Sequence, residues 1–367
     1  MNVFLFLLVS ILFIQIFYFC IMKVDYIIVG CGLAGISFCE KLKANNKSFV
    51  VFEDSSQQSS IVAGGLYNPV TLKRFTPVWK SEEQLKTALP VYNQLEKDFG
   101  VVLDYKVPVR RRFTSLEEQN NWFEASDKVG LKPFINTTLI DNANPNVDAQ
   151  FKLGEVLSTG RLDTKLLVQN YKSDLLSKGC LISQSFNHNS LVCKDNQVVY
   201  NDIEAKHIVF AEGFGIKQNP FFNALPLGGT KGQLLTIHAP ELKLDYVLKS
   251  SVFVIPLGND TYRVGSTYEQ KDKTNTITTE AKDMLLNKLK TFVKCDFKVL
   301  NQVAGVRPTV KDRKPLVGRH KDFKNLYLFN GLGSRGVMIA PYVANQLYNF
   351  IESNVAIDAE IDCSRFY

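Results

Sequence analysis

The order of apolar and polar residues near the start of the chain predicts a strand, a helix and a second strand. Asp25–Val29 ends in an unbroken apolar run, which is typical of a parallel strand buried on both faces. Residues 36–43 have helical composition, and residues 48–53 form a second apolar run that ends on an acid. This alternation of strand, helix and strand predicts an α/β fold with a parallel sheet.

The turn between the first strand and the helix has the glycine spacing G-x-G-x-x-G. The first glycine permits a tight turn, the second lets the backbone approach a pyrophosphate, and the third allows close packing of helix on strand. An acid at the end of the second strand accepts hydrogen bonds from ribose and repels the 2′-phosphate of NADP. The pattern predicts a site for NAD or for the ADP half of FAD. Its residues are Gly30, Gly32, Leu33, Ala34, Gly35 and Glu53.

A second turn of the same kind lies near the other end of the chain. Leu326–Phe329 is predicted to be a strand, and a helix with regularly spaced apolar residues follows it. A simple NAD dehydrogenase has no need for a second helix N-terminus, whereas a reduced flavin carries negative charge that such a terminus stabilises. The second turn therefore favours FAD as the cofactor. Its small residues are Gly331, Gly333, Ser334 and Gly336.

The middle of the chain supplies a returning strand and a β-rich insert. His207–Phe210 is predicted to return to the nucleotide site, with Ala211 and Gly213 at a close approach. Short β-rich runs predict an antiparallel sheet at residues 233–237, 251–255 and 262–266. We therefore predict an α/β protein with a Rossmann-like FAD-binding domain and a second, antiparallel-sheet substrate domain of the α+β kind. We assign residues 22–85, 151–229 and 302–367 to the FAD-binding domain, and residues 86–150 and 230–301 to the substrate domain.

Residues 1–21 form an apolar N-terminal segment without a charged side chain. About 20 apolar residues are enough to span a bilayer. A signal peptide fits poorly, because no basic residue precedes the run and no small-x-small cleavage site follows it. Two explanations stay open: a membrane contact through residues 1–22, and a reading frame whose true start is Met22. We accordingly expect a cytoplasmic protein, or a membrane-anchored one with its catalytic domain in the cytoplasm.

Charge and cysteine usage narrow the chemistry. The net charge is +7, and we interpret the one dense basic run, Arg110–Arg112, as solvated surface. An anionic partner for this run, such as RNA, an acidic lipid surface or a carboxylate, is the alternative. The seven cysteines form no CxxC pair and the four histidines no HxH or HxxxH pattern. We therefore expect a reducing compartment and no metal site.

Four further stretches complete the pattern. They are SSIVAGGLYNP at 59–69, HIVFAEGFG at 207–215, YRVGSTYE at 262–269 and GVRPTVKDRKPLVG at 305–318. Together with the two glycine turns, they resemble the D-amino-acid oxidase (DAO) superfamily of FAD-dependent oxidoreductases, from Met22 to about Ile351. Within it, LYNPVTLKR and GLGSRG are most similar to the FAD domain of the oxidoreductase that modifies the wobble uridine of tRNA.

The resemblance implies roles for single residues. Gly64 and Gly65 match the loop beside the flavin, and Gly331–Gly336 matches the turn that faces the pyrimidine end of the ring. Arg307 matches the arginine that binds the substrate carboxylate, for which a forked guanidinium is well suited. The alternative for this arginine is a structural salt bridge, for instance with Asp312.

One departure from the family pattern concerns the second clamp on the substrate carboxylate. Glycine oxidase places a tyrosine where this chain has Phe253, which puts a small free amino acid in doubt as the substrate. Tyr246 and Tyr268 are candidate substitutes. Arg335, inside the second glycine turn, is either another anion contact or a capping residue.

The resemblance implies FAD-dependent oxidation of the C–N bond of an amine or amino acid, by hydride transfer to flavin N5. One alternative is a flavoprotein that acts in tRNA wobble-uridine modification, with RNA as its partner. Another is a non-catalytic, membrane-tethered dinucleotide-binding module. The electron acceptor, whether oxygen, a quinone or a protein, stays open.

Overall fold

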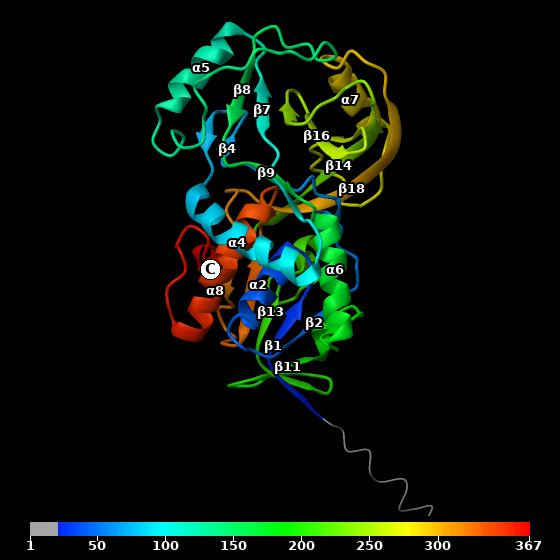
Figure 1. Ribbon diagram of the computed structural model, residues 1–367. Helices are drawn as coiled ribbons and strands as arrows, with labels where there is room; N and C mark the ends of the chain where they lie inside the picture. Colours follow the sequence, from blue (N-terminus) through cyan, green and yellow to red (C-terminus); the bar gives the residue numbers. More distant parts are fainter. Residues whose placement is uncertain (1–20) are drawn as a thin grey trace, which may run out of the picture.

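The computed structural model describes residues 21–367 and has two parts, each built around one large sheet (Figure 1). The predicted apolar N-terminal segment lies outside the described residues, except for Ile21. Within residues 21–367, no helix combines the length and the apolar composition that crossing a bilayer requires.

The lower part in Figure 1 contains an eight-stranded sheet. The strands β2, β1, β13 and β20 run parallel, and β10 extends the parallel set beyond β2. Tyr26, Ile27 and Ile28 of β1 are completely buried, as expected for a strand covered on both faces. The strands are β1 Met22–Val29, β2 Phe49–Phe52, β10 Leu181–Ile182, β11 Leu191–Cys193, β12 Val198–Tyr200, β13 Ile203–Phe210, β19 Leu316–Arg319 and β20 Leu326–Asn330.

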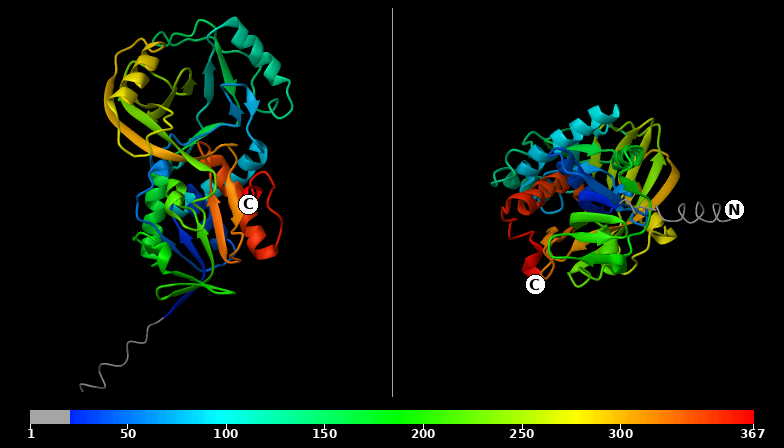
Figure 2. Two further views of the ribbon diagram at one scale, coloured as in Figure 1. Left: turned by 180° about the vertical axis from the view of Figure 1, so that it is seen from behind. Right: turned by 90° about the horizontal axis from the view of Figure 1, so that it is seen from below.

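Helices cover this sheet where the chain crosses between parallel strands. The helices α2 and α8 pack against each other, and α4 lies against α8 (Figures 1 and 2). The helices of the chain are α2 Leu33–Lys43, α3 Ser59–Val62, α4 Ser81–Phe99, α5 Leu116–Ser126, α6 Thr164–Ser177, α7 Thr279–Lys290 and α8 Gly336–Ser353. Short 3₁₀ turns span His188–Ser190, Gly213–Gln218 and Cys363–Phe366.

The upper part contains a seven-stranded sheet in the order β18-β14-β17-β16-β15-β7-β8. Its strands are antiparallel except where β15 runs parallel to β7. One face is covered by α7, whose Leu285 and Leu289 are completely buried. The strands are β7 Val109–Arg112, β8 Leu153–Val156, β14 Leu227–His238, β15 Val247–Lys249, β16 Phe253–Gly258, β17 Thr261–Gly265 and β18 Lys298–Val310.

Short strands lie between the two large sheets. A three-stranded sheet contains β3 Leu66–Tyr67, β9 Gly160–Leu162 and β6 Asp104–Tyr105, and a hairpin contains β4 Val70–Thr71 and β5 Thr76–Pro77. The run at residues 233–237, predicted as a short strand, belongs to the 12-residue strand β14. The predicted boundaries at 229/230 and 301/302 fall inside β14 and β18, which continue across them, and the domain bounds stay a prediction.

Candidate active site

The first glycine turn is packed too tightly for other residues. Gly30 has a φ of +104°, and a Cβ on it would lie 2.5 Å from the carbonyl oxygen of Ala211. A Cβ on Gly35 would overlap the carbonyl oxygen of Gly30. The turn therefore brings the end of β1 directly against the end of β13 and against the first turn of α2, where the backbone N–H groups lack intrahelical acceptors.

Glu53 is fixed at the end of β2 by three hydrogen bonds. Its carboxylate accepts from the Cys31 backbone N at 2.6 Å, from the Ser55 backbone N at 2.8 Å and from Lys172 Nζ at 3.0 Å. A carboxylate has about four acceptor positions, so one stays available for a ribose hydroxyl. Lys172 was not predicted as part of this site, because it comes from α6, far away in the sequence.

The loop after α3 is held between the two large sheets. A Cβ on Gly64 would lie 2.9 Å from Ile255 Cδ1 of β16, and Gly65 has a φ of +72°. Ser60 Oγ of α3 accepts a hydrogen bond from the Leu33 backbone N at 3.1 Å. The loop predicted to lie beside the flavin therefore connects the first glycine turn to the upper sheet.

The second glycine turn lies beside the first one. Gly331 and Gly333 have φ values of +76° and +58°. Asn330 joins this turn to the end of β13, because its Nδ2 donates to the Gly213 carbonyl at 2.8 Å. A Cβ on Gly336 would lie 3.1 Å from Leu33 Cδ1, so the N-termini of α8 and α2 are neighbours although the sequence separates them widely.

These features fit FAD. Both glycine turns keep the space next to a helix N-terminus free of Cβ atoms, and Glu53 faces the first turn. The residues that would hold the ADP part are Gly30, Gly32, Leu33, Ala34, Gly35 and Glu53. Those that would hold the flavin part are Gly64, Gly65, Gly331, Gly333, Ser334 and Gly336, and Ala211 and Gly213 approach the nucleotide from the end of β13. All these assignments stay predictions.

Arg307, on β18, is a half-buried cation without an acidic partner. Its NH2 donates to Ser266 Oγ at 2.7 Å and its NH1 to the Thr267 carbonyl at 3.4 Å, and no carboxylate among residues 21–367 forms a salt bridge with it. Burial lowers the pKa of this guanidinium. Asp312, the alternative partner considered above, pairs with Arg365 at 3.0 Å. Arg307 therefore has donors free for an anionic ligand.

Of the two candidate tyrosines, the structure brings only Tyr268 to Arg307. The guanidinium carbon of Arg307 lies 4.8 Å from the ring centre of Tyr268, and the Tyr268 hydroxyl is 2.9 Å from Ser334 Oγ in the second glycine turn. Tyr246 instead packs in the cluster under α7 and carries Arg110 over its ring at 4.3 Å. Tyr268 therefore links Arg307 of the seven-stranded sheet to the second glycine turn.

Strand register shows which side chains share a face with Arg307. A Cβ on Gly232 of β14 would overlap the Arg307 guanidinium. Leu234, two residues further along β14, lies on that face and is opposite Gly265 of β17. Gly232 and Gly265 have no side chains, so the Arg307 guanidinium packs directly over Gly232 and the Leu234 side chain packs directly over Gly265.

Phe253 and Lys249 continue this face toward β7. Phe253 is opposite Gly265, and Lys249 is opposite Phe253, with its Nζ 4.6 Å from the ring centre. Among the described residues Lys249 Nζ has no hydrogen bond and no salt bridge. Burial, and then the charge of Arg111, lower the pKa of Lys249 to about 8.

Arg335 precedes α8 and donates from NH2 to Thr71 Oγ1 at 2.8 Å. No acidic residue in the described part of the chain forms a salt bridge with it, and burial lowers its pKa. Its position at the helix N-terminus agrees with both roles considered above, so its assignment stays a prediction.

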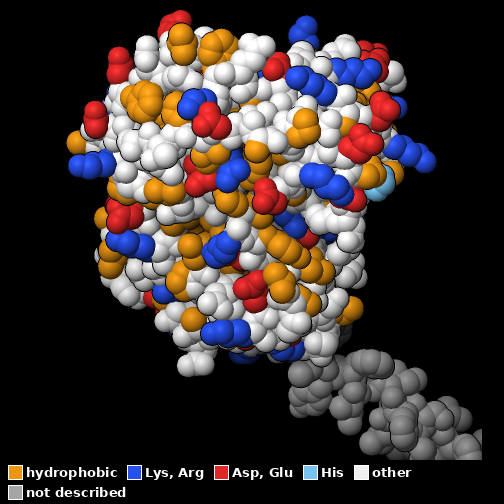
Figure 3. All heavy atoms as spheres, turned by 45° about the horizontal axis from the view of Figure 1, so that its top comes forward, with side chains coloured by type: hydrophobic (Ala, Val, Ile, Leu, Met, Phe, Trp, Pro, Cys, Tyr) orange, Lys and Arg blue, Asp and Glu red, His pale blue; other side chains and the backbone are white. Residues whose placement is uncertain are grey.

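The three consecutive arginines of β7 are not solvated surface, and that interpretation is wrong. Arg110, Arg111 and Arg112 are half-buried and pair with Glu155, Glu118 and Asp148. Charges of both signs are also interspersed on the face shown in Figure 3. The arginine run is therefore neutralised within the protein.

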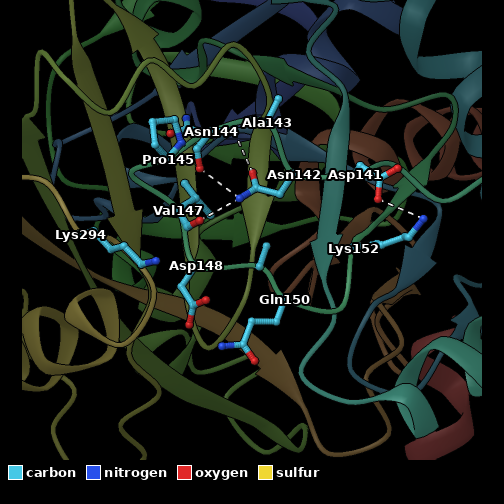
Figure 4. Close-up of a pocket in the computed structure, with 11 residues that line it drawn as sticks. Asp141, Asn142, Ala143, Asn144, Pro145, Val147, Asp148, Gln150, Lys152 and Lys294 are labelled. Carbon is cyan, nitrogen blue, oxygen red and sulfur yellow. Dashed lines mark hydrogen bonds and ion pairs between the residues drawn. The ribbon is translucent and has the colours of Figure 1, made fainter.

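A hollow on the upper part lies away from the glycine turns (Figure 4). Its polar groups bond to one another: Asn142 Nδ2 donates to the carbonyls of Asn144 at 3.0 Å and Val147 at 2.8 Å, and Lys152 pairs with Asp141 at 3.0 Å. The hollow is wide and open, and it contains none of the predicted site residues, so we do not assign it a function.

Comparison with known proteins gives one match that covers most of this chain and another that covers a smaller part of it. The tRNA 5-methylaminomethyl-2-thiouridine biosynthesis bifunctional protein of Legionella pneumophila (strain Lens) is 26% identical over 380 residues, covering 90% of this chain and 54% of that protein. Glycine oxidase of Bacillus subtilis (strain 168) is 28% identical over 147 residues, covering 38% of this chain and 39% of that protein. The chain thus spans about half or less of these relatives' length.

Solved structures show the same fold. Glycine oxidase from Geobacillus kaustophilus superimposes with a TM-score of 0.78 at 17% identity, covering 94% of this chain and 99% of that chain. Iminodiacetate oxidase from Chelativorans sp. BNC1 gives a TM-score of 0.76 at 16% identity, covering 92% and 98%. These likenesses confirm the predicted fold class.

The model of the family described as DAO, FAD dependent oxidoreductase, matches residues 25–349, which is most of the chain. The match includes both glycine turns, Glu53 and Arg307. The predicted family and the predicted cofactor, FAD, are confirmed. The chain belongs to the DAO family of FAD-dependent oxidoreductases.

Proposed function

We propose that this oxidoreductase oxidises the C–N bond of an amine or amino acid that carries a carboxylate, by hydride transfer to N5 of FAD. The observation that carries the proposal is the unpaired guanidinium of Arg307 on the face that is directed to the Gly64 loop. A half-buried cation without a counter-ion lowers stability, and a bound carboxylate would offset that loss.

The chain's own residues would orient the substrate. Arg307 would bind the carboxylate through its free N–H groups, with Tyr268 covering one side of the guanidinium. The absence of a side chain at Gly232 lets the Arg307 guanidinium lie flat against β14, where it would hold the carboxylate end of the substrate. FAD, when bound, supplies the two-electron acceptor. The positive end of α8 would stabilise the negative charge that reduction leaves on the ring.

Two relatives support a carboxylate next to an oxidisable nitrogen. Glycine and iminodiacetate, the compounds named in two of the similar solved structures, each have a nitrogen and a carboxylate on one CH₂ group. Phe253 argues against a clamp identical to that of glycine oxidase, so N-substituted glycines are the first compounds to test.

The test is anaerobic mixing of the FAD-loaded protein with pairs of compounds that differ only in the carboxylate. N-methylglycine is compared with dimethylamine, and iminodiacetate with diethylamine. We expect the flavin absorbance to bleach with at least one carboxylate member and not with its partner. Equal bleaching by both members of every pair would contradict the role of the carboxylate, and no bleaching by any small compound would favour a larger substrate.

Our second candidate is a larger substrate, and the position of Lys249 relative to Arg307 favours it. Arg307 and Lys249 lie four strands apart on one face, which corresponds to about 19 Å between their backbones. A free amino acid is too short to reach both cations, whereas a carboxymethylated nucleotide of an RNA has a carboxylate and phosphates at such a separation. The Legionella pneumophila relative, which carries tRNA in its name, agrees with this candidate.

Adding RNA to the anaerobic holoprotein distinguishes the two candidates. Transfer RNA with a carboxymethylaminomethyl wobble uridine should bleach the flavin, and raised salt should abolish the effect because phosphate contacts are screened. The control is the matching unmodified tRNA, added in tenfold excess, which should not bleach the flavin. A non-catalytic module is not proposed further, because the chain is an oxidoreductase.

A further inference from the structure

A second group of arginines lies on the other side of the Gly64 loop. A cavity of about 160 Å³ lies where β9, the start of α6, the loop after α3 and the tip of the β16–β17 hairpin meet. Its wall includes Gly64, Arg161 of β9 and Arg263 of β17. Arg307 does not line this cavity.

Each of the two arginines has one donor atom that is buried and unpaired. Arg161 Nε and Arg263 NH1 are buried and have no hydrogen-bond partner within residues 21–367. Arg161 is only 7% exposed, and its guanidinium carbon lies 4.5 Å from the ring centre of Tyr105. Buried donors are satisfied in the great majority of cases, so two unpaired donors on residues that line one cavity mark an incompletely satisfied cluster.

The charges in the cavity are also unbalanced. Asp163 is the acid that lines it, 3.4 Å from Arg161 NH1, and its other oxygen already accepts from the Leu166 backbone N. Lys165 adds a further positive charge at the rim. Burial, and then the charge of Arg161, lower the pKa of Arg263. Arginine stays protonated in proteins, so a ligand is needed to neutralise the pair.

We propose that Arg161 and Arg263 form a second anion site, which binds a small free oxyanion of the phosphate or carboxylate class. Two guanidinium groups suit an oxyanion because several N–H donors can share its oxygens. Water in the cavity would satisfy the two donors but would leave the positive charge in place. The site is separate from Arg307, and the proposal does not depend on which substrate the enzyme oxidises.

Isothermal titration of the full-length, FAD-loaded protein with inorganic phosphate, and separately with acetate, tests the proposal. The buffer is free of other oxyanions, and chloride is held constant. We expect at least one of the two anions to bind at one site that persists in Arg307→Ala and weakens at least tenfold in Arg263→Met. Arg319→Gln removes one exposed arginine elsewhere and should bind as the wild type does.

A second variant, Arg263→Lys, is a control for misfolding. Arg263→Lys keeps the charge but not the fork, and it should bind the anion several-fold more weakly than the wild type while retaining its flavin. The proposal is overturned if neither anion binds the wild type, which would leave water as the occupant. It is also overturned if the site that remains in Arg307→Ala is not weakened in the double variant Arg307→Ala/Arg263→Met, or if neither anion binds to Arg307→Ala.

Discussion

Two regions of the seven-stranded sheet hold their arginines in different surroundings: β7, which lies next to the edge strand β8, and the strands β17 and β18 near the opposite edge. On β7, Arg110 lies 3.0 Å from Glu155, and Arg111 pairs with Glu118. On β17 and β18, Arg263 and Arg307 have no salt bridge to any acid within the described chain. Both regions belong to one sheet, so the difference lies in what the neighbouring elements contribute.

The comparison teaches which cations can act on a ligand. An arginine whose fork is already filled by a carboxylate contributes to the fold and has little left to offer an anion. A buried arginine without a partner costs stability, and such strain is expected at functional sites. The most conspicuous basic run of the sequence is therefore structural, whereas the isolated arginines are the ones that we propose as ligand sites.

The largest expected effect is on catalysis. Arg307→Ala should lower kcat/KM for carboxylate-bearing substrates about a hundredfold or more, because breaking a buried charge pair costs about 2–5 kcal/mol. Flavin reduction followed by stopped-flow absorbance measures the loss, and flavin content should stay at the wild-type level. Arg111→Ala, on β7, is the matched control. An equal loss of activity in both variants would contradict the proposed difference between the two regions.

Replacing an arginine by methionine should affect the free energy of unfolding differently in the two regions. Arg111→Met leaves the half-buried Glu118 without its partner and should lower the free energy of unfolding by about 2 kcal/mol. Arg263→Met removes an unpaired cation and should leave the value unchanged or raise it by about 1 kcal/mol. Urea unfolding in buffer without oxyanions measures both, and a larger loss in Arg263→Met would contradict the account.

A smaller expected effect is a pH dependence of RNA binding that follows from the charge of Lys249. The charged groups around it are Arg111 of β7, Glu118 of α5, Lys288 of α7 and Lys73 of the β4–β5 hairpin. Lys249 has a pKa of about 8, below its ordinary value, so it is charged below that pH and loses its charge as the pH rises through it.

If Lys249 contacts an RNA phosphate, affinity should fall several-fold between pH 7 and pH 9 at fixed ionic strength. Fluorescence anisotropy with a labelled anticodon stem-loop measures this. Lys249→Met should bind weakly at both pH values, with a flatter profile. An identical pH profile in wild type and variant would exclude this contact.

Local spacing explains why part of the fold was predictable. The first glycine turn, Glu53 and the second turn each lie within a strand–turn–helix unit, where sequence neighbours are also neighbours in space. The predicted strand at Asp25–Val29 is the second half of β1, and that at Leu326–Phe329 is most of β20. The family resemblance supplied Arg307, which chain spacing alone does not distinguish from a structural arginine.

Contacts across strands were not predictable in this way. Lys172 meets Glu53 from α6, Tyr268 meets Ser334, and Arg161 meets Arg263 only after the two parts have packed together. The basic run on β7 misled for the same reason, because two of its three acids, Glu155 and Asp148, come from distant parts of the chain. Charge pairing depends on tertiary packing, which leaves no local pattern in the sequence.

The central claim is that Arg307 binds the carboxylate of the substrate, and a ligand that cannot react tests it most directly. Acetate has no oxidisable nitrogen and can be titrated against the oxidised holoenzyme while the flavin spectrum is recorded, with phosphate present at saturation to occupy the second site. The account predicts a saturable spectral change in the wild type and in Arg263→Met, and none in Arg307→Ala. An unchanged titration in Arg307→Ala would contradict it.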